Sequence, residues 1–315
     1  AYDGIQALDL TGPFEVFHGA NGVLDERSSR RPRYELSVVS LDGGPVVTES
    51  RLPIGTTPLD HGADVHTLVL PGGFGARAAT GDERLVEAVR RLAGRAERVV
   101  TVCTGAFVLA ASGAADGRRM TTHWAWASTM QRKFPAVTVD ADPIYVRDGR
   151  VWSSAGVTAG IDLALAVVEA DHGGEVAQVV ARWLVMFLRR PGGQSQFAAP
   201  VWSERAATTP IRAAQDLVDQ DPGGDHRIGV LAEQVGMSTR HFTRRFTDET
   251  GISPARYVAE VRIEAARRAL ETTADTVEVI ARRCGFGTAE TMRRTFTRRL
   301  RVSPDQYRRR FRRRS

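Results

Sequence analysis

Cysteine, lysine and long apolar runs are scarce in this 315-residue chain. It has only 2 cysteines, Cys103 and Cys284, so no disulfide framework is indicated and the chain fits a reducing cytoplasm. No apolar run approaches the roughly eighteen residues needed to cross a bilayer, and no signal peptide is visible. Lys133 is the only lysine, so arginine carries nearly all of the positive charge. We therefore expect a cytoplasmic protein with no membrane partner, no metal and no cofactor.

Charge is distributed unevenly along the chain. Residues 1–200 carry a net charge of −2 and residues 201–315 a net charge of +8, which together give the +6 of the whole chain. Residues 281–315 alone reach +11. A basic element of this kind attracts nucleic-acid phosphates and makes the affinity depend on salt. The alternative is that these arginine-rich helices are merely solvated, in a chain whose composition favours arginine throughout.

The last ninety residues contain an internal repeat with an offset of about fifty positions. The residues that recur 50 positions later are Arg244, Phe246, Ser253, Pro254 and Tyr257, as Arg294, Phe296, Ser303, Pro304 and Tyr307. Upstream the offset is 49, since Leu231, Ala232 and Gly236 correspond to Ile280, Ala281 and Gly285. The repeated unit is a helix, a turn with glycine, a second helix and a Ser-Pro helix start. This pattern predicts two helix-turn-helix units, at about residues 226–250 and 275–300.

In the first unit, Gly236 ends one helix and Ser238 caps the next. Phe242 and Phe246 lie four apart and are predicted to face inward, opposite a stripe formed by Arg240, Thr243, Arg244 and Thr247. In the second unit we expect Asp275 to cap the first helix with Glu278 three residues later, and Cys284 to be core. The inward pair there is Met292 and Phe296, and the outward stripe is Glu290, Arg293, Arg294 and Thr297.

The segment from Ala255 to Thr272 lacks proline and glycine and is predicted to form one helix of about 27 Å. A strut of that length suits two recognition helices about one DNA turn, roughly 34 Å, apart.

Residues 210–315 closely resemble the AraC-type DNA-binding domain, whose hallmark is this pair of units joined by one helix. The resemblance implies base-reading positions at Arg240, Thr243 and Arg244 in the first unit, and at Ala289, Glu290 and Arg294 in the second. Two arginines one helical turn apart favour guanines, and Glu290 can accept from a cytosine amino group. Ala289 departs from the longer polar residue often found there, so we expect the second unit to contribute more phosphate contact than base discrimination.

The first two hundred residues have a different pattern. Apolar runs at residues 36–39, 68–70 and 99–102 alternate with helical stretches, which is typical of a parallel sheet covered by helices on both faces. The length of the chain favours two domains, which we place at residues 1–190 and 210–315 with a linker at 191–209. Ala1 to Gly4 resembles the end of a first strand, so we expect further residues to precede Ala1.

Three clusters in this first part carry residues suited to chemistry. Cys103 follows a strand and opens a helix, where the helix dipole is expected to lower the pKa of the thiol. Gly72 and Gly73 follow another strand, in a loop able to present backbone donors to an anion. Glu15 lies near the start of a helix that begins with Asp9-Leu-Thr-Gly-Pro.

Together with His123, the order of these clusters resembles the PfpI-like branch of the class I glutamine-amidotransferase-like superfamily, which implies an α/β flavodoxin-like parallel sheet with flanking helices. By this resemblance Cys103 and Glu15 match a neighbouring cysteine and acid, and Gly72 and Gly73 an oxyanion-type loop. His123 matches a histidine that approaches the cysteine in some members, and its alternative is a packed histidine. Thr104 stands where protease-like members place histidine, whereas isonitrile hydratases share the Asp-Leu-Thr-Gly-Pro and Cys-Thr-Gly patterns.

A PfpI-like domain followed by an AraC-type domain is the arrangement of the GlxA-like transcriptional regulators. The resemblance implies a bacterial, nucleoid-associated regulator that binds promoter or operator DNA, with a small-molecule effector, a second copy of the chain and RNA polymerase as candidate partners. Helices at 158–171 and 175–190 are candidate dimer surfaces, or pack within one chain. Cys103 is a small buried residue, part of a ligand pocket without chemistry, or the nucleophile of an isonitrile hydratase-type enzyme. A nucleoid-type binder without sequence preference is a third alternative.

Overall fold

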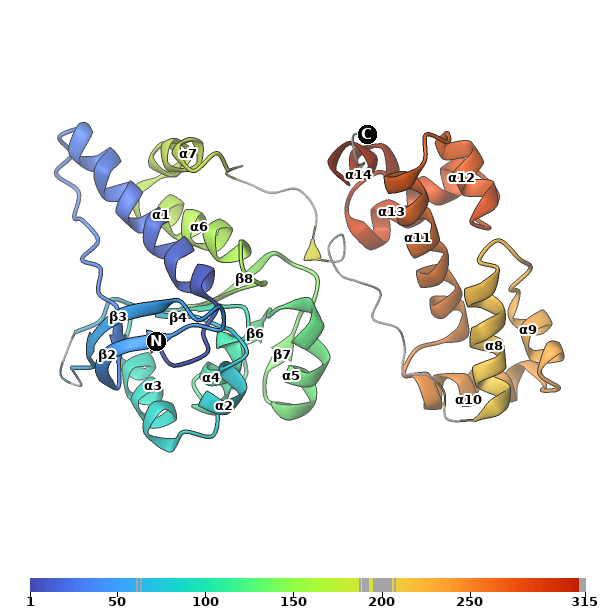
Figure 1. Cartoon of the computed structure of the whole chain (residues 1–315), viewed down its shortest axis with the longest axis horizontal. Coiled ribbons are helices and arrows are strands. Elements are labelled where there is room, and N and C mark those ends of the chain that lie inside the picture. Colours follow the sequence, from blue (N-terminus) through green and yellow to red (C-terminus); the bar gives the residue numbers. More distant parts are fainter. Residues whose placement is uncertain are drawn as a thin grey trace. The chain divides into compact units, whose positions relative to one another are not determined.

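In the computed structural model the chain forms two compact units, residues 1–194 and 195–315 (Figure 1). The structure describes residues 1–60, 62, 64–186, 188, 193–194, 206 and 208–311. Most of the segment expected as a linker, 191–209, lies outside the described residues. The first unit extends past the expected end at residue 190 because Gly193 and Gln194 are buried in it.

The N-terminal unit is built on a four-stranded sheet with the strand order β4-β5-β9-β8. Three of these strands are parallel, namely β4 (Thr67–Leu70), β5 (Arg98–Val102) and β9 (Val151–Ser154). The edge strand β8 (Tyr145–Asp148) is antiparallel. The strands expected at residues 68–70 and 99–102 are thus confirmed, in a sheet that is mixed at one edge.

Two small sheets flank this one. The first joins β1 (Val39–Ser40), β3 (Pro53–Pro58) and β2 (Asp42–Val47), and the second joins β6 (Arg119–Met120) and β7 (Thr138–Val139). The apolar run at 36–39 enters a strand only at Val39; Leu36 packs against the core instead. Residues 1–4 form no strand, because Asp3 and Gly4 make a turn.

Helices cover both faces of the central sheet (Figure 1). Side chains alternate along each strand, so Val100 and Trp152 join one core and Val99 and Val151 the other. The first core packs against α1 (Ala7–Glu26), α6 (Ala159–His172) and α7 (Gly174–Trp183). Around the second lie α2 (Ala76–Ala79), α3 (Glu83–Arg95), α4 (Gly105–Ala111), the 3₁₀ helix η1 (Trp124–Trp126) and α5 (Ala127–Lys133). This is the expected flavodoxin-like architecture.

The two helices considered as dimer surfaces pack within the unit. Leu163, Leu165 and Val168 of α6 are buried in the core that also contains residues of α1 and α7. The helix α7 ends at Trp183, earlier than the expected residue 190, and Val185 beyond it adopts a left-handed backbone with φ of 53°. Arg190 lies outside the described residues.

The C-terminal unit is helical throughout its described part. Its helices are α8 (Thr209–Gln220), α9 (Ile228–Gln234), α10 (Thr239–Thr250), α11 (Pro254–Thr272), α12 (Val277–Arg283), α13 (Ala289–Leu300) and α14 (Pro304–Phe311). The pairs α9–α10 and α12–α13 are the two expected helix-turn-helix units. Gly236 and Gly285 turn the chain with φ of 68° and 76°, which only glycine adopts readily.

Each unit has its own aromatic core. Phe242, Phe246 and Tyr257 are buried in the first, and the second contains Met292, Phe296, Tyr307 and Cys284. The repeat extends further upstream than the sequence indicated: the Tyr257 hydroxyl donates to Asp219 of α8, and the Tyr307 hydroxyl donates to Glu271 of α11. The helix α8 therefore supports the first unit as α11 supports the second.

Candidate functional site

The helix α10 presents two arginines on a free surface. Ser238 caps it as expected, its hydroxyl accepting from the amide of His241. Arg240 and Arg244 are exposed and, among the described residues, make no ion pair. Thr243 lies between them but is half-buried, and its hydroxyl donates to the carbonyl of Thr239. The two guanidinium groups, one helical turn apart, are therefore available for base edges.

The second recognition helix, α13, presents one arginine and one acid in place of two arginines. Arg294 and Glu290 are exposed, whereas Ala289 is half-buried and packs against the core of its unit. Arg293 pairs with Glu278 of α12 at 3.7 Å. Of the three positions predicted to read bases in this unit, Arg294 and Glu290 are therefore the exposed ones.

The cap expected at Asp275 is wrong. Thr276 caps α12 instead, its hydroxyl accepting from the amide of Val279. Asp275 is drawn away because its carboxylate binds Arg283 at 2.8 Å.

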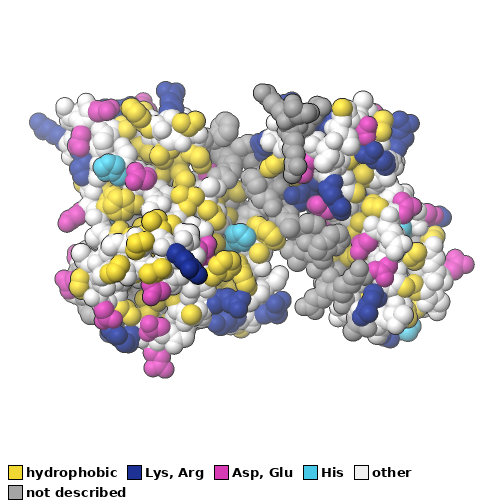
Figure 2. All heavy atoms as spheres, in the orientation of Figure 1, with side chains coloured by type: hydrophobic (Ala, Val, Ile, Leu, Met, Phe, Trp, Pro, Cys, Tyr) yellow, Lys and Arg dark blue, Asp and Glu magenta, His cyan; other side chains and the backbone are white. Residues whose placement is uncertain are grey.

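The helix α11 joins the two units as one uninterrupted element. It begins with Ser253 as cap and Pro254 at the first helical position, as the sequence predicted. Its 19 residues span about 28 Å at 1.5 Å per residue. On the face drawn in Figure 2, basic side chains of the C-terminal unit are interspersed with acidic ones. The positive charge on that face therefore comes from individual arginines and does not form a uniform basic surface.

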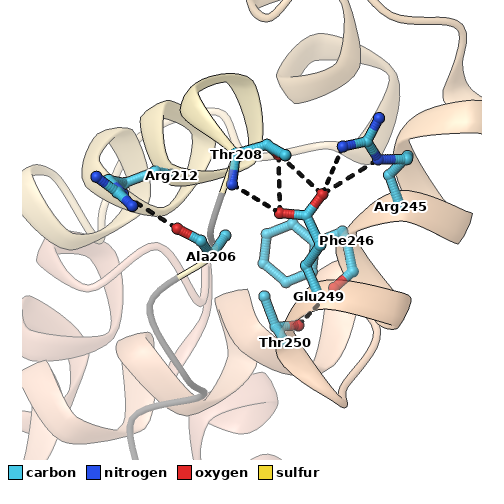
Figure 3. Close-up of polar contacts among 7 residues, drawn as sticks. All are labelled: Ala206, Thr208, Arg212, Arg245, Phe246, Glu249 and Thr250. Carbon is cyan, nitrogen blue, oxygen red and sulfur yellow. Dashed lines mark hydrogen bonds and ion pairs between the residues drawn. The ribbon is translucent and has the colours of Figure 1, made fainter.

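The segment that enters the C-terminal unit is bonded to the first recognition helix (Figure 3). The amide and hydroxyl of Thr208 both donate to the carboxylate of Glu249, at 3.1 and 2.8 Å. Arg245 donates to the same carboxylate at 2.8 Å, and these hydrogen bonds lower the pKa of Glu249 although burial opposes them. This junction fixes the C-terminal end of α10 relative to the start of α8.

In the N-terminal unit, Cys103 lies at the bend between β5 and α4. Its φ of 55° is left-handed, and its amide donates to the carbonyls of Ser154 and Ala155. Close packing holds the bend, because a Cβ on Gly105 would lie 2.2 Å from the carbonyl oxygen of Leu70. The strand-turn-helix cysteine that the sequence predicted is therefore present, in a strained and buried form.

The acid beside Cys103 is Asp9, and the expected partner Glu15 is exposed. Both residues lie on α1, but six residues rotate a helix by about 240°, so they face different sides. Asp9 is fully buried and accepts from the amide of Gly72 at 3.0 Å. Burial raises the pKa of Asp9 to about 7, and contacts with Gly72, Val157 and Cys103 oppose the increase. Its other oxygen, Oδ1, has no hydrogen-bond partner among the described residues.

The thiol of Cys103 is not activated. Burial raises its pKa to about 12, and the negative charge of Asp9 adds to the increase. The expectation of a lowered pKa is therefore wrong, because α4 has only 7 residues and burial outweighs its dipole.

The glycine loop holds no free donors for an oxyanion. The amide of Gly72 binds Asp9, and that of Gly73 binds the hydroxyl of Thr104 at 2.8 Å. The next amide, of Phe74, binds Glu49 at 2.9 Å. Thr104 also closes the loop by donating to the carbonyl of Gly73. The loop expected to bind an anion thus uses its amides to bind protein oxygens.

His123 lies near this site without joining it. A Cβ on Gly156 would lie 2.1 Å from Cδ2 of His123, so the ring packs directly on that glycine. Its Nδ1 accepts from the amide of Ala125, and burial lowers the pKa of the ring. The neighbouring residue Thr122 contacts the cysteine instead: its hydroxyl donates to the carbonyl of Cys103 at 2.7 Å.

Gln194, which sequence analysis missed, anchors the end of the N-terminal unit beside the hydrogen bond between Thr122 and Cys103. Its buried side-chain amide donates to the hydroxyl of Thr121 and the carbonyl of Thr122, both at 2.9 Å. Its oxygen accepts from the amide of Trp124 at 2.8 Å. Asp9, also missed, did have a signal, because it begins the Asp-Leu-Thr-Gly-Pro motif; Gln194 had none.

The described residues form no helix that is both long and apolar enough to cross a membrane. They also contain no group of three or more His, Cys, Asp or Glu side chains placed to hold a metal ion.

An α/β domain with a cysteine at a strand-turn-helix bend, followed by tandem helix-turn-helix units, defines a two-domain DNA-binding protein. The model of the DJ-1/PfpI family matches residues 1–170, and a helix-turn-helix domain model matches residues 231–310. The chain belongs to the DJ-1/PfpI family, in the group of transcriptional regulators whose second domain is an AraC-type helix-turn-helix domain.

Three relatives illustrate this. The HTH-type transcriptional regulator Rv1931c of Mycobacterium tuberculosis is 39% identical over 269 residues, which cover 79% of this chain and 97% of that protein. The HTH-type transcriptional regulator GlxA of Rhizobium meliloti is 27% identical over 89% of this chain and 86% of its own length. An isonitrile hydratase of Pseudomonas putida is 33% identical over 180 residues, which cover 56% of this chain and 72% of the enzyme.

Proposed function

We propose that this transcriptional regulator recognises an asymmetric DNA site in each subunit through Arg240 and Arg244 of α10 and through Arg294 and Glu290 of α13. The observation that carries the proposal is the pair of exposed arginines one turn apart on α10, without acidic partners among the described residues. The two units present unlike side chains, so they favour unlike base sequences.

We further propose that the N-terminal domain binds a small polar effector at the Asp9–Cys103 corner. Asp9 supplies a carboxyl group with a pKa of about 7, one oxygen of which has no hydrogen-bond partner within the described part of the chain, and Cys103 supplies a neutral thiol. The glycine-loop amides are occupied, and the thiol is protonated at neutral pH, which favours binding over turnover.

The proposed mechanism is linkage between this corner and DNA binding. Thr122 binds the carbonyl of Cys103, and Gln194 binds the carbonyl of Thr122, so hydrogen bonds run from the corner to the last residue of the N-terminal unit. An effector that prefers one arrangement of this path shifts the population of dimers that fit the operator. The proposed partners are operator DNA, a second copy of the chain, a small effector and RNA polymerase, in the bacterial cytoplasm.

A footprint on the DNA flanking its own coding region tests the proposal. We expect protection that is lost when Arg240 and Arg244 are both replaced by alanine and kept when Cys103 is replaced by alanine. Titrations at several salt concentrations separate specific binding from charge attraction, because only the former distinguishes operator from random DNA. Equal affinity for both at every salt concentration would support a nucleoid-type binder instead.

The similarity to an isonitrile hydratase favours one second candidate, a cysteine-dependent enzyme joined to a DNA-binding domain. Its test is product release from isonitriles by the full chain. Activity that Cys103→Ala abolishes, with DNA binding unchanged, would establish this alternative.

A further inference from the structure

Arg262 lies in the middle of α11, the helix that both helix-turn-helix units share. Its Nε donates to the carbonyl of Pro222 at 3.0 Å, and its Nη2 donates to the carbonyl of Gly224 at 2.9 Å. These carbonyls belong to the loop between α8 and α9, which leads into the first unit. One guanidinium thus holds that loop at two points.

The same guanidinium packs against the turn of the second unit. A Cβ on Gly285 would lie 2.7 Å from Nε and 2.8 Å from Cζ of Arg262, so a side chain at this position would displace the guanidinium. The loop and the turn also meet directly, because a Cβ on Gly223 would lie 2.5 Å from the carbonyl oxygen of Arg283. Arg262 therefore joins three segments from both units.

A cleft of about 680 Å³ lies beside this contact between the loop and the turn. It is lined by residues of the loop, of α11 and of the second turn, among them Arg227, Arg262 and Arg282. Burial lowers the pKa of the Arg262 guanidinium, while the charge of Asp225 opposes that effect. The planar guanidinium donates to two carbonyls, which fixes its orientation. The single ammonium group of lysine cannot reproduce this arrangement.

We propose that Arg262 is a positioning residue for DNA recognition, which fixes the first helix-turn-helix unit against the second so that α10 and α13 reach DNA at one separation and one rotation. The proposal rests on the proposed function, in which both helices read bases. Arg262 itself contacts no base in this proposal; it acts through the loop at Pro222–Gly224 and the turn at Gly285.

The test uses the full chain and DNA duplexes based on the footprinted operator, in which the first subsite is the sequence read by α10 and the second is the sequence read by α13. The three duplexes are the intact operator, the operator with one base pair inserted between the two subsites, and the operator with the second subsite scrambled. The variant is Arg262→Lys. Its matched control is Arg256→Lys, on the same helix but exposed and paired with Glu260. A melting curve for each protein reports folding, and Arg262→Gln serves as a second variant if the lysine variant melts early.

We expect the insertion to weaken the wild-type protein about 100-fold, because the second unit then loses its base contacts. Arg262→Lys should bind the intact operator about 10-fold more weakly but lose only about 3-fold on insertion, and it should match the wild type on the scrambled duplex. An insertion penalty equal to that of the wild type, or an equal loss on all three duplexes, would overturn the proposal. A wild-type protein that does not distinguish operator from random DNA would instead refute the proposed function.

Discussion

Asp9 and Cys103 lie together in the closed corner between α1 and the bend after β5, where burial and, second to it, the charge of Asp9 keep the Cys103 thiol protonated. Burial raises the pKa of Cys103 to about 12, and the charge of Asp9 is the second cause. The pair therefore differs from an activated cysteine and acid, in which the thiolate predominates at neutral pH.

Alkylation measures this directly. We expect Cys103 in the full chain to react with iodoacetamide at pH 8 at least 10-fold more slowly than an exposed thiol, because only the thiolate attacks. Asp9→Asn removes the second cause of the raised pKa, so the rate at pH 9 should increase severalfold. A Cys284→Ser background isolates the signal. Rapid labelling of Cys103 at pH 7 would contradict the protonated thiol.

Asp9 should also make stability depend on pH. Its folded pKa of about 7 lies above the ordinary value, so the contribution of its neutral form is fully present below pH 4 and is lost as pH rises through 7. We expect Asp9 to make the free energy of unfolding of the N-terminal domain lower at pH 8 than at pH 5 by about 3 kcal/mol at most, since its proton is lost over roughly two pH units between pH 5 and 7. Asp9→Asn should remove most of this dependence.

Asp171 provides a control of opposite sign. Burial would raise its pKa, but hydrogen bonds from Arg98 and Tyr34 lower it overall. Its contribution is present above the ordinary pKa and is lost as pH falls through the lowered one, so Asp171→Asn should destabilise at pH 7 and leave the difference between pH 5 and pH 8 unchanged. Equal pH dependence in Asp9→Asn and in the wild type would contradict the pKa of Asp9, because His123 and His172, whose pKa values burial lowers, titrate alike in both proteins.

The recognition arginines should contribute base discrimination. We expect Arg240→Ala and Arg244→Ala each to cost about 1–3 kcal/mol on the cognate site and much less on scrambled DNA, because each guanidinium pairs with a guanine. Anisotropy titrations with both duplexes measure this. Arg84→Ala, an exposed arginine of the N-terminal unit, removes the same charge and should change neither affinity. Equal losses on both duplexes would leave these arginines only a phosphate role.

The repeated tyrosines should both stabilise the C-terminal unit through charged partners. The Tyr307 hydroxyl donates to Glu271 and accepts from Arg267, and the Tyr257 hydroxyl donates to Asp219. We expect Tyr307→Phe and Tyr257→Phe each to lower the free energy of unfolding by about 1–3 kcal/mol, since hydrogen bonds to charged groups contribute most. Urea unfolding of the full chain gives both values, and an unchanged free energy of unfolding in either variant would contradict this role of its hydroxyl.

Gln194 should stabilise the segment beside the cysteine. Gln194→Leu keeps the size but removes the bonds to Thr121, Thr122 and Trp124, so hydrogen exchange at residues 121–124 should become at least 10-fold faster. The matched control is Gln215→Leu, because Gln215 is buried in the C-terminal unit and accepts from the amide of Ala206. Unchanged exchange in Gln194→Leu would exclude Gln194 from the proposed path.

The C-terminal unit was predictable from sequence because its signals are local. Glycines at the turns, Ser-Pro helix starts and inward residues at helical spacing fixed both recognition helices before any tertiary contact was known. The cap predicted at Asp275 was wrong because the neighbouring Thr276 can also cap, and Asp275 instead binds Arg283 at the other end of the same short helix.

The cysteine corner was less predictable because burial and helix phase are tertiary properties. Asp9 and Glu15 are both acids near the start of one helix, and only the rotation of α1 against the sheet decides which reaches Cys103. The sequence also predicted that the glycine loop can bind an anion. Its amides instead donate to the carboxylates of Asp9 and of Glu49, which lies in a distant turn.

The helix α11 belongs to both aromatic cores of the C-terminal unit, since Val258 and Val261 lie in the first and Ala266 and Leu270 in the second. If either core unfolds, α11 loses its packing at one end. Because the hydrogen bonds of the helix are continuous, its packing in the other core is then weakened as well. The two DNA-reading modules should therefore denature in a single cooperative transition, although their sequences are copies that look separable.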